Sequence, residues 1–410
     1  MVDAVPGAAA PKRAIVIGGS MSGLFAGLML RQRGFDVQIY ERVDSELAGR
    51  GAGIVAQPVV SDMLRALGID PVDLGVKMST RRVLDVDGRI VCEHQRPQTL
   101  TAWERLYRML RDAFPADLYK RGVGLKGFEQ SSRSVTAHFS DGSTAEAELL
   151  IGADGIRSTV RQQVLPELGP LYAGYVAWRA LVAEGAFPPD IHREVFEFLT
   201  FCLPPGEQFL GYPVAGPDND LRPGHRRYNV VWYRPADERT ELQWLLTDER
   251  GTTHTISIPP PLIRRDAIAA MRAAAERLIA PQMRAVARLM DEPVLQPIYD
   301  LATPRMAFGR VAIVGDAAFV ARPHVGAGVS KAAEDAEALA NAVAIEDIEP
   351  ALRRFESERL AVGHRIIEWA RHLGAYLQAT RTLEEQARSA RHSTAEAVIR
   401  ETALLDFLET

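Results

Sequence analysis

The chain has 410 residues, 47% of them hydrophobic, so it is long enough for two domains with full apolar cores. Its net charge is −5 and no block of Lys and Arg stands out, which argues against a nucleic-acid partner. Cys92 and Cys202 are too few for a disulfide framework or a zinc-type spacing and predict a cytoplasmic protein without a metal, although one disulfide between them stays open.

The N-terminal segment MVDAVPGAAAPKR is small and polar, and it lacks the basic start and apolar stretch of a secretion signal. We therefore expect a flexible tail over residues 1–12. No apolar run approaches the ~18 residues of a membrane span, so no membrane partner is expected. A strand at Ala14–Ile17, a helix at Ser22–Arg33 and a strand at Val37–Tyr40 together predict a βαβ unit.

The turn between the first strand and helix reads G-G-S-M-S-G. In a dinucleotide-binding fold the first glycine makes the tight turn, the last lets helix and strand pack closely, and the helix N-terminus receives a diphosphate. Serine replaces the usual middle glycine, and its hydroxyl could bond the same anion. A purely structural turn stays open as the alternative. The candidate cofactor-binding residues here are Gly18, Gly19, Ser20, Met21, Ser22 and Gly23.

Glu41 stands at the end of the second strand, where a carboxylate can accept both hydroxyls of a ribose. A carboxylate there disfavours a 2′-phosphate, which fits FAD or NAD rather than NADP. Arg42 could lie against the adenine or face water. In the following segment R-G-A-G-I, Arg50 offers a forked donor and Gly53 lets the chain pass close to a planar ligand, unless the segment is a plain surface loop.

Further along, Asp-Gly pairs predict hairpins at Val83–Val91 and Val135–Ala147, with a helix at Ala102–Ala113 between them. A buried strand at Leu149–Gly152 leads to Asp154-Gly155. In the next part of the chain, strand-like runs are separated by loops of Pro, Gly and Asp, and we expect an inserted domain of sheet and helix. Its predicted elements are strands at Tyr175–Val182, Val195–Leu203, Gln208–Val214 and Tyr228–Tyr233, and a helix at Met271–Met290.

The chain returns to the nucleotide-binding domain with a strand at Val311–Val314 that ends in Gly315-Asp316, followed by a helix at Val329–Val343. Asp316 could accept a ribityl hydroxyl, and the helix entrance would face the pyrimidine end of a flavin. His324 lies in that entrance and could polarise a substrate oxygen or accept its proton. The remaining residues, 349–410, are expected to be helical with a break at Arg381–His392.

Aromatic side chains are spread over the inserted domain and could wall a pocket for a planar substrate, although most could equally be ordinary core. Alternate residues of a strand share a face, so the set cannot all point one way. The set consists of the aromatic residues Tyr175, Trp178, Tyr212, Trp232 and Tyr233 together with Arg179.

Three motifs in order give a family resemblance over nearly the whole chain: GGSMSG with Glu41-Arg42, GADGIRSTVR, and GDAAFVARPHVGAGVSKAAEDAEALA. The chain resembles the single-component FAD-dependent aromatic hydroxylases of the para-hydroxybenzoate hydroxylase type. Within them it is most similar to dihydroxypyridine 3-hydroxylases and related enzymes of N-heteroaromatic breakdown, on the segments GYVAWRALV and FLGYPV. Several positions depart from the wider family pattern, which puts substrate contacts of phenol-type relatives in doubt: Phe319, Ala327, Ser330 and Trp103.

The resemblance implies an α/β fold: a Rossmann-like FAD-binding domain of the GR2/PHBH type, an inserted sheet-plus-helix substrate domain and a helical C-terminus. The expected FAD-binding segments are 13–80, 98–165 and 298–345, the substrate-binding segments are 81–97 and 166–297, and the C-terminal helices span 346–410. Beyond the turn residues, the implied FAD contacts are Glu41, Arg42, Arg50, Gly53, Val55, Leu125, Asp154, Asp316, Gly326, Ala327 and Gly328.

By this resemblance the chain is a cytoplasmic monooxygenase that hydroxylates an electron-rich hydroxylated ring, with a hydroxypyridine as the expected substrate. NAD(P)H reduces FAD, O₂ adds at C4a, and the flavin hydroperoxide transfers one oxygen atom. His324 and then Tyr212 are the candidate catalytic residues. A flavoprotein epoxidase or reductase, a hydroxylase of a non-pyridine phenol and a non-catalytic module stay open, as does a homodimer. A halogenase is disfavoured because no Trp-x-Trp-x-Ile-Pro segment is present.

Overall fold

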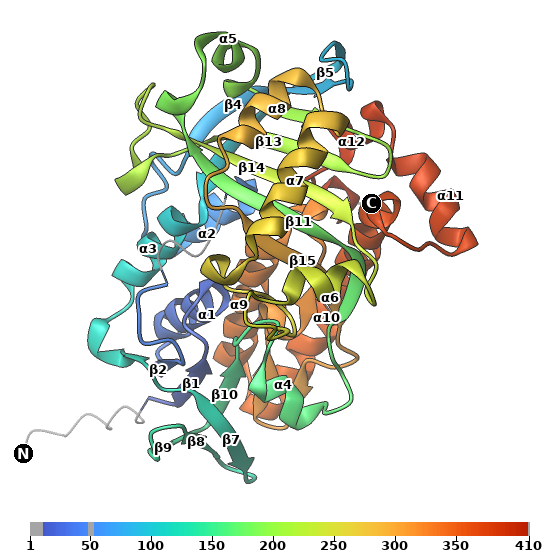
Figure 1. Ribbon diagram of the computed structural model, residues 1–410. Helices are drawn as coiled ribbons and strands as arrows, with labels where there is room; N and C mark the ends of the chain where they lie inside the picture. The colour runs from blue at the N-terminus through green and yellow to red at the C-terminus, as the bar shows by residue number, and fades with distance from the viewer. Residues whose placement is uncertain (1–10, 48–52, 409–410) are drawn as a thin grey trace, which may run out of the picture.

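The computed structural model describes residues 11–47 and 53–408 and arranges the chain in three β-sheets with flanking helices (Figure 1). All but the last two residues of the expected N-terminal tail lie outside the described part. Within that part, none of the helices is long and apolar enough to cross a bilayer. The thiols of Cys92 and Cys202 are both free, so the disulfide alternative is wrong.

The first sheet has six strands in the order β16-β17-β10-β1-β2-β6, and those from β17 to β6 run parallel. Helix α1 (Met21–Gln32) connects β1 to β2, which confirms the predicted βαβ unit. The central strands are continuous apolar runs because both faces of a parallel sheet are covered. The strand bounds are β1 Arg13–Ile17, β2 Asp36–Glu41, β6 Tyr119–Arg121, β10 Leu149–Gly152, β16 Ala307–Phe308 and β17 Val311–Ile313.

The second sheet has nine strands in the order β18-β15-β11-β14-β13-β12-β4-β5-β3. Helices α7 (Arg265–Leu278) and α8 (Pro281–Arg288) lie across one of its faces in Figure 1 and share an apolar core with it. Its strands are β3 Gly53–Ala56, β4 Val76–Leu84, β5 Ile90–Ala102, β11 Leu171–Ala183, β12 Leu199–Cys202, β13 Gln208–Val214, β14 Arg227–Pro235, β15 Val294–Ala302 and β18 Phe319–Val320. The expected domain boundaries stay a prediction. Strand β5 runs without interruption across the expected boundary between residues 97 and 98.

Both Asp-Gly hairpins form as predicted, since Gly88 and Gly142 take the positive φ that such turns require. The first joins β4 to β5. The second joins β8 (Val135–Phe139) to β9 (Thr144–Ala147), which form the third sheet with β7 (Leu125–Gln130).

The remaining helices cover the sheets and the C-terminal part of the chain. Helix α9, which begins at the glycine-rich entrance, packs along both α1 and α10. Their bounds are α2 Pro58–Ala66, α3 Trp103–Ala113, α4 Thr159–Val164, α5 Pro189–Ile191, α6 Glu241–Leu246, α9 Gly328–Ile345, α10 Ile348–Gly374, α11 Leu383–His392 and α12 Ala395–Glu401.

Three predicted elements differ from the structure. The strand predicted at Val195–Leu203 begins only at Leu199, because a short π-helix occupies His192–Phe196. The helix predicted at Met271–Met290 is two helices, since Pro281 cannot continue α7 and instead begins α8. The break predicted at Arg381–His392 is largely α11, whose start is fixed by a capping box between Thr382 and Glu385.

Candidate functional site

The turn between β1 and α1 requires glycine at its first and last positions. Gly18 has φ +104°, and a Cβ there would lie 2.4 Å from the carbonyl oxygen of Ala153 on the neighbouring strand end. A Cβ on Gly23 would lie 1.8 Å from the carbonyl oxygen of Gly18. The glycines therefore allow helix, strand and turn to approach one another, as the sequence pattern predicts.

The N-terminus of α1 is open. The N–H groups of Met21, Ser22 and Gly23 donate no hydrogen bond to any residue within 11–47 or 53–408, and the Ser20 side chain does not cap the helix. Unsatisfied N–H groups at the positive end of a helix are the usual binding site of a phosphate. This arrangement fits the diphosphate of FAD.

Glu41 ends β2 beside this turn, and its carboxylate is buried. One oxygen accepts the N–H of Gly19 at 2.8 Å and the other accepts the N–H of Val43 at 2.9 Å. These bonds fix the orientation of the carboxylate, and each oxygen has a further lone pair for a hydroxyl. Ribose binding by Glu41 therefore fits the geometry and stays a prediction.

A cavity of about 260 Å³ opens at the carboxyl ends of β1 and β2. It is lined by the turn, by Glu41 and the exposed Arg42, and on its far side by the start of β7 and the segment after β10. Six of the predicted FAD contacts lie on its wall: Gly18, Ser20, Glu41, Arg42, Leu125 and Asp154. The adenosine end of FAD fits here by the polarity and position of these groups.

Asp154 is also engaged within the protein. Its carboxylate accepts the Ser158 hydroxyl at 2.5 Å and the N–H of Thr159 at 2.6 Å, so it binds the N-terminus of α4. Burial raises the pKa of this carboxyl. The side chain thus holds the GADG segment against the cavity, and direct contact with FAD stays a prediction.

The second glycine-rich segment opens α9. Gly326 has φ +66°, and a Cβ there would lie 2.8 Å from the Cβ of Ala403. Ala327 precedes the helix, and the N–H groups of Gly328, Val329 and Ser330 make no hydrogen bond within the described ranges. This is a second open helix N-terminus, as expected for the pyrimidine end of a flavin.

The segment that follows β17 touches the first turn of α1. A Cβ on Gly315 would lie 1.9 Å from the hydroxyl oxygen of Ser22, so the end of β17 meets the first turn of α1. Asp316, the next residue, is about half exposed and lies 3.6 Å from the Lys331 ammonium. A single FAD molecule that contacts both glycine-rich segments fits this arrangement and stays a prediction.

The segment before β3 connects the cofactor region to the second sheet. Gly53 donates its N–H to the Asn229 side-chain oxygen at 2.9 Å, and a Cβ there would lie 2.6 Å from the Tyr212 ring. Val55 follows in β3 and pairs with Leu100. Arg50 lies outside the described residues, so its predicted contact is not placed.

The aromatic residues of the second sheet divide between its two faces, as the alternation of a strand requires. Trp178 and Trp232 pack under α7 and α8 and are ordinary core. Tyr175, Tyr212 and Tyr233 share a cluster on the opposite face. We call these three tyrosines, together with His324, the aromatic wall.

Arg179 belongs to the same face. It pairs across strands with Val231 of the wall's cluster and donates to Gln296 at 2.7 Å. Burial raises the pKa of Tyr212, and it raises the pKa of Tyr233 to about 12, while the positive charge of Arg179 lowers both. Both phenols are therefore protonated at neutral pH.

His324 contacts two of the three tyrosines in the aromatic wall. Its Nε2 is 2.9 Å from the Tyr175 hydroxyl, and its ring centroid is 4.4 Å from that of Tyr233. Burial and then the charge of Arg322 lower the pKa of His324 to about 3, so the ring is neutral at physiological pH. Its Nδ1 makes no hydrogen bond within the described part of the chain.

Sequence reasoning did not find several residues that build the site. Arg322 is buried, pairs with Asp300 at 2.8 Å and lies over the Tyr175 ring. Asn229 receives the Gly53 N–H but leaves its own amide nitrogen unpaired and buried. These partners come from distant parts of the chain, and no local pattern marks them.

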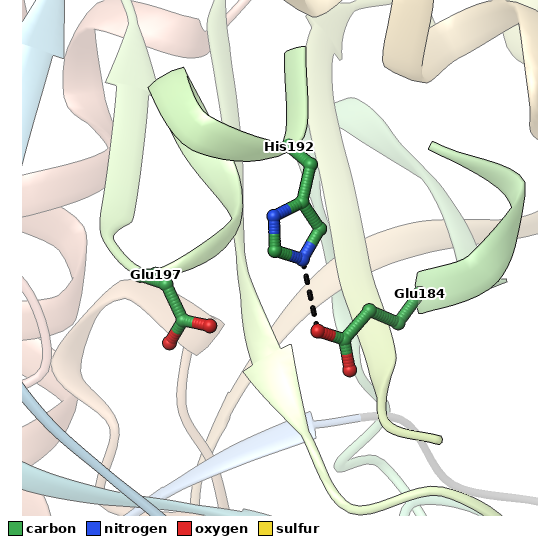
Figure 2. Close-up of side chains that lie close together, drawn as sticks. All are labelled: Glu184, His192 and Glu197. Carbon is green, nitrogen blue, oxygen red and sulfur yellow. Dashed lines mark hydrogen bonds and ion pairs between the residues drawn. The ribbon is translucent and has the colours of Figure 1, made fainter. Parts of the chain in front are cut away.

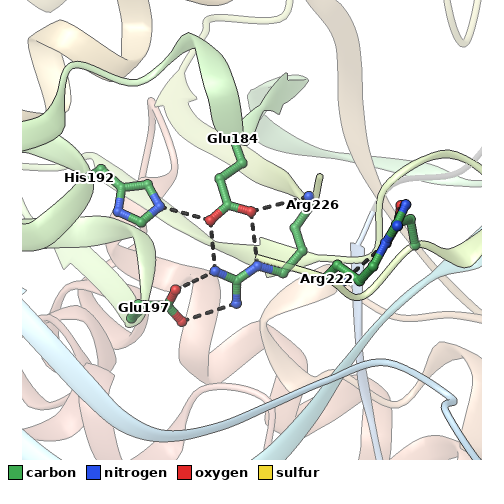
Figure 3. A network of polar contacts seen from close by, with 6 residues as sticks. Glu184, His192, Glu197, Arg222 and Arg226 are labelled. Atoms are coloured by element: carbon green, nitrogen blue, oxygen red, sulfur yellow. Dashed lines mark hydrogen bonds and ion pairs between the residues drawn. The ribbon is translucent and has the colours of Figure 1, made fainter. Parts of the chain in front are cut away.

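A separate polar cluster lies at the end of β11. The side chains of Glu184, His192 and Glu197 converge as metal ligands can (Figure 2). Arg226, however, donates to both carboxylates (Figure 3). Burial alone would raise the pKa of Glu184, but the bonds from Arg226 and His192 lower it to about 2. The cluster already contains its cation and is an ion-pair network.

Comparison with known proteins gives consistent matches over the chain. A family model described as FAD binding domain-like matches residues 172–300. The chain is 34% identical to 2,6-dihydroxypyridine 3-monooxygenase of Paenarthrobacter nicotinovorans, over 89% of this chain and 91% of that protein.

Two solved structures have the same fold. The first is 2,6-dihydroxypyridine-3-hydroxylase from Arthrobacter nicotinovorans, with a TM-score of 0.85 and 32% identity over 91% of this chain and 94% of that one. The second is Klebsiella pneumoniae HpxO complexed with FAD and uric acid, with a TM-score of 0.75 and 25% identity over 95% of both chains.

Proposed function

We propose that this chain, which belongs to the FAD-dependent aromatic monooxygenases, hydroxylates a hydroxypyridine or a closely similar hydroxylated N-heteroaromatic ring. The observation that carries the proposal is the aromatic wall with a neutral, buried His324 at its edge. Tyrosine rings and hydroxyls are groups that bind planar, polar rings, and the histidine offers one free ring nitrogen to such a substrate.

FAD is the cofactor. Three groups would hold it: the open N-terminus of α1, the open N-terminus of α9, and Glu41 at the end of β2. When bound, FAD reacts with NAD(P)H and O₂ and supplies the oxygen atom that enters the ring. The family implies NAD(P)H as the co-substrate, and the chain has a single dinucleotide-binding turn. We propose a cytoplasmic location from its two free thiols.

The aromatic wall orients the substrate and excludes water. Tyr212 and Tyr233 keep their protons at neutral pH, so each can donate a hydrogen bond to a ring oxygen or nitrogen. Their hydroxyls have no hydrogen-bond partner within the described residues, which leaves them available to a ligand. Exclusion of water by these aromatic side chains would also protect a reactive intermediate from side reactions with water.

His324 contacts the substrate as a neutral group. A pKa of about 3 means that the imidazole has a low affinity for a proton, so general base catalysis by it would be weak. We propose instead that His324 hydrogen-bonds the substrate through Nδ1 and so fixes the tautomer of the substrate ring, while the Tyr175 hydroxyl holds Nε2. Electron density on the ring is then set by which substrate oxygen or nitrogen carries the proton.

The experiment is a panel of hydroxylated pyridines and matched phenols, each scored for stimulated NAD(P)H oxidation and for a product one oxygen atom heavier. A dihydroxypyridine that stimulates oxidation and is converted stoichiometrically supports the proposal. Conversion of phenols but of no pyridine would contradict it and would favour the phenol hydroxylase alternative.

A further inference from the structure

Lys331 carries a buried ammonium group that the protein leaves largely uncompensated. It lies in the first turn of α9, and its side chain is 1% exposed. Its Nζ makes no hydrogen bond to any residue of the described ranges. The nearest charge is the Asp316 carboxylate at 3.6 Å, which is itself 55% exposed. A buried cation without hydrogen bonds is unfavourable, and one half-exposed carboxylate compensates it only in part, so its retention calls for a further anion.

Two acidic residues one turn further along this helix already have partners. Asp335, one turn further along α9, accepts the Gly315 N–H at 3.1 Å with one oxygen and Arg359 at 2.9 Å with the other. Glu334 also binds Arg359. These carboxylates are therefore neutralised by Arg359 rather than by Lys331.

The position of Lys331 indicates which anion is missing. Asp316, its ion-pair partner, directly follows Gly315, which contacts Ser22 in the first turn of α1. That turn carries the three free N–H groups that fit a diphosphate. Helices α1 and α9 also pack along each other, so Lys331 and Asp316 belong to the part of the fold where α9 begins beside α1.

We propose that Lys331 is the buried counter-charge of the FAD diphosphate, with the Asp316 carboxylate orienting its ammonium from the solvent side. The open end of α1 supplies hydrogen bonds to the phosphates, and Lys331 supplies a full positive charge that a helix end lacks. This assignment rests on FAD binding alone and is independent of which ring is the substrate.

The test compares the wild-type holoenzyme with Lys331→Met, which removes the charge at similar length, and Lys331→Gln, which keeps an uncharged polar end. Lys77→Met is the matched control, because Lys77 lies on an exposed position of β4. The dissociation constant of oxidised FAD is measured from the flavin fluorescence released when the yellow protein is diluted. The midpoint potential of the bound flavin is measured in parallel.

Removal of the buried positive charge near the phosphates should weaken FAD binding by about tenfold or more in both Lys331 variants. The midpoint potential should stay near that of the wild type, because the diphosphate carries the same charge in both redox states. Lys77→Met should change neither quantity.

Three results would overturn the assignment. Unchanged FAD affinity in both Lys331 variants would show that no cofactor anion needs this cation. Unchanged affinity with a lowered melting temperature would make Lys331 a purely structural residue. A lowered midpoint potential with unchanged affinity for oxidised FAD would place the charge at the reduced flavin ring instead. Folding of both Lys331 variants is checked by circular dichroism. One folded variant is enough for the comparison with the wild type, and Gln and Met differ in polarity, so the two offer separate chances of a folded protein.

Discussion

The hydroxyl of Tyr175 lies 2.9 Å from Nε2 of His324, although 149 positions separate the two residues in the chain. Tyr175 belongs to β11 of the second sheet, and His324 to the segment that opens α9. This hydrogen bond therefore joins the wall of the proposed substrate site to the segment proposed to hold the flavin.

Replacing Tyr175 with Phe should uncouple the reaction. The buried His324 nitrogen would lose its partner, at a cost of about 1–3 kcal/mol in the free energy of unfolding, and the ring would be free to turn. We expect more NAD(P)H consumed per molecule of hydroxylated product, with the FAD dissociation constant unchanged. The measurement is the ratio of product formed to NAD(P)H oxidised.

Tyr172→Phe is the matched control for this variant. Tyr172 lies on the same strand and donates its hydroxyl to the Ala236 carbonyl oxygen, without a bond to His324. Coupling should stay at the wild-type ratio. Equal uncoupling in the two variants would remove the specific role assigned to the bond between Tyr175 and His324.

His324 should also make the protein sensitive to acid. Its pKa is about 3 in the folded chain and near 6.5 when unfolded, so between these values the unfolded state binds more protons. The free energy of unfolding therefore falls as pH drops from about 6.5 towards 3, by up to about 1.4 kcal/mol per pH unit from this group.

The His324→Gln variant tests this dependence. Glutamine does not titrate, so a plot of melting temperature against pH should be flatter over that range than for the wild type. Parallel curves for the two proteins would mean that His324 does not titrate as a buried neutral group.

The tight turn at Gly23 should tolerate no side chain. In Gly23→Ala the new Cβ would lie 1.8 Å from the Gly18 carbonyl oxygen, which forces apart the strand end and the helix start. We expect loss of bound flavin and a destabilisation of at least about 1–3 kcal/mol. Gly169→Ala, which has open space around the added carbon, should retain flavin and stability, and absorbance near the flavin maximum distinguishes the two.

Short-range signals explain which parts of the fold could be predicted. The turn from Gly18 to Gly23 and the hairpin turns at Gly88 and Gly142 have local causes, namely positive φ or a close approach, that the residue type reveals. Strand β15 was not predicted, because Pro297 lies inside it and proline usually argues against a strand.

The site was less predictable than the fold. The glycines and Glu41 have a recognisable spacing, but the charges around them come from remote segments. Arg322 meets Asp300 of β15, and Lys331 meets Asp316 only after α9 packs against the end of β17. Burial of a charge, the feature that singles out Lys331, exists only in the folded chain.

Glu41→Gln should weaken FAD binding while leaving the fold intact. The amide keeps one oxygen acceptor but replaces the other with a donor, so it cannot accept both the backbone N–H groups and two ribose hydroxyls. An increase of about tenfold or more in the FAD dissociation constant is expected. Glu146→Gln, at an exposed position of β9, should show the wild-type value. A normal constant for Glu41→Gln would contradict the ribose assignment.

Turnover of 2,6-dihydroxypyridine under isotope-labelled O₂ in the presence of NAD(P)H tests ring hydroxylation by this protein directly. We expect a hydroxylated product that carries one labelled oxygen atom on the ring, formed only by the flavin-containing protein. NAD(P)H oxidation that yields hydrogen peroxide and unchanged rings across hydroxypyridines would contradict it.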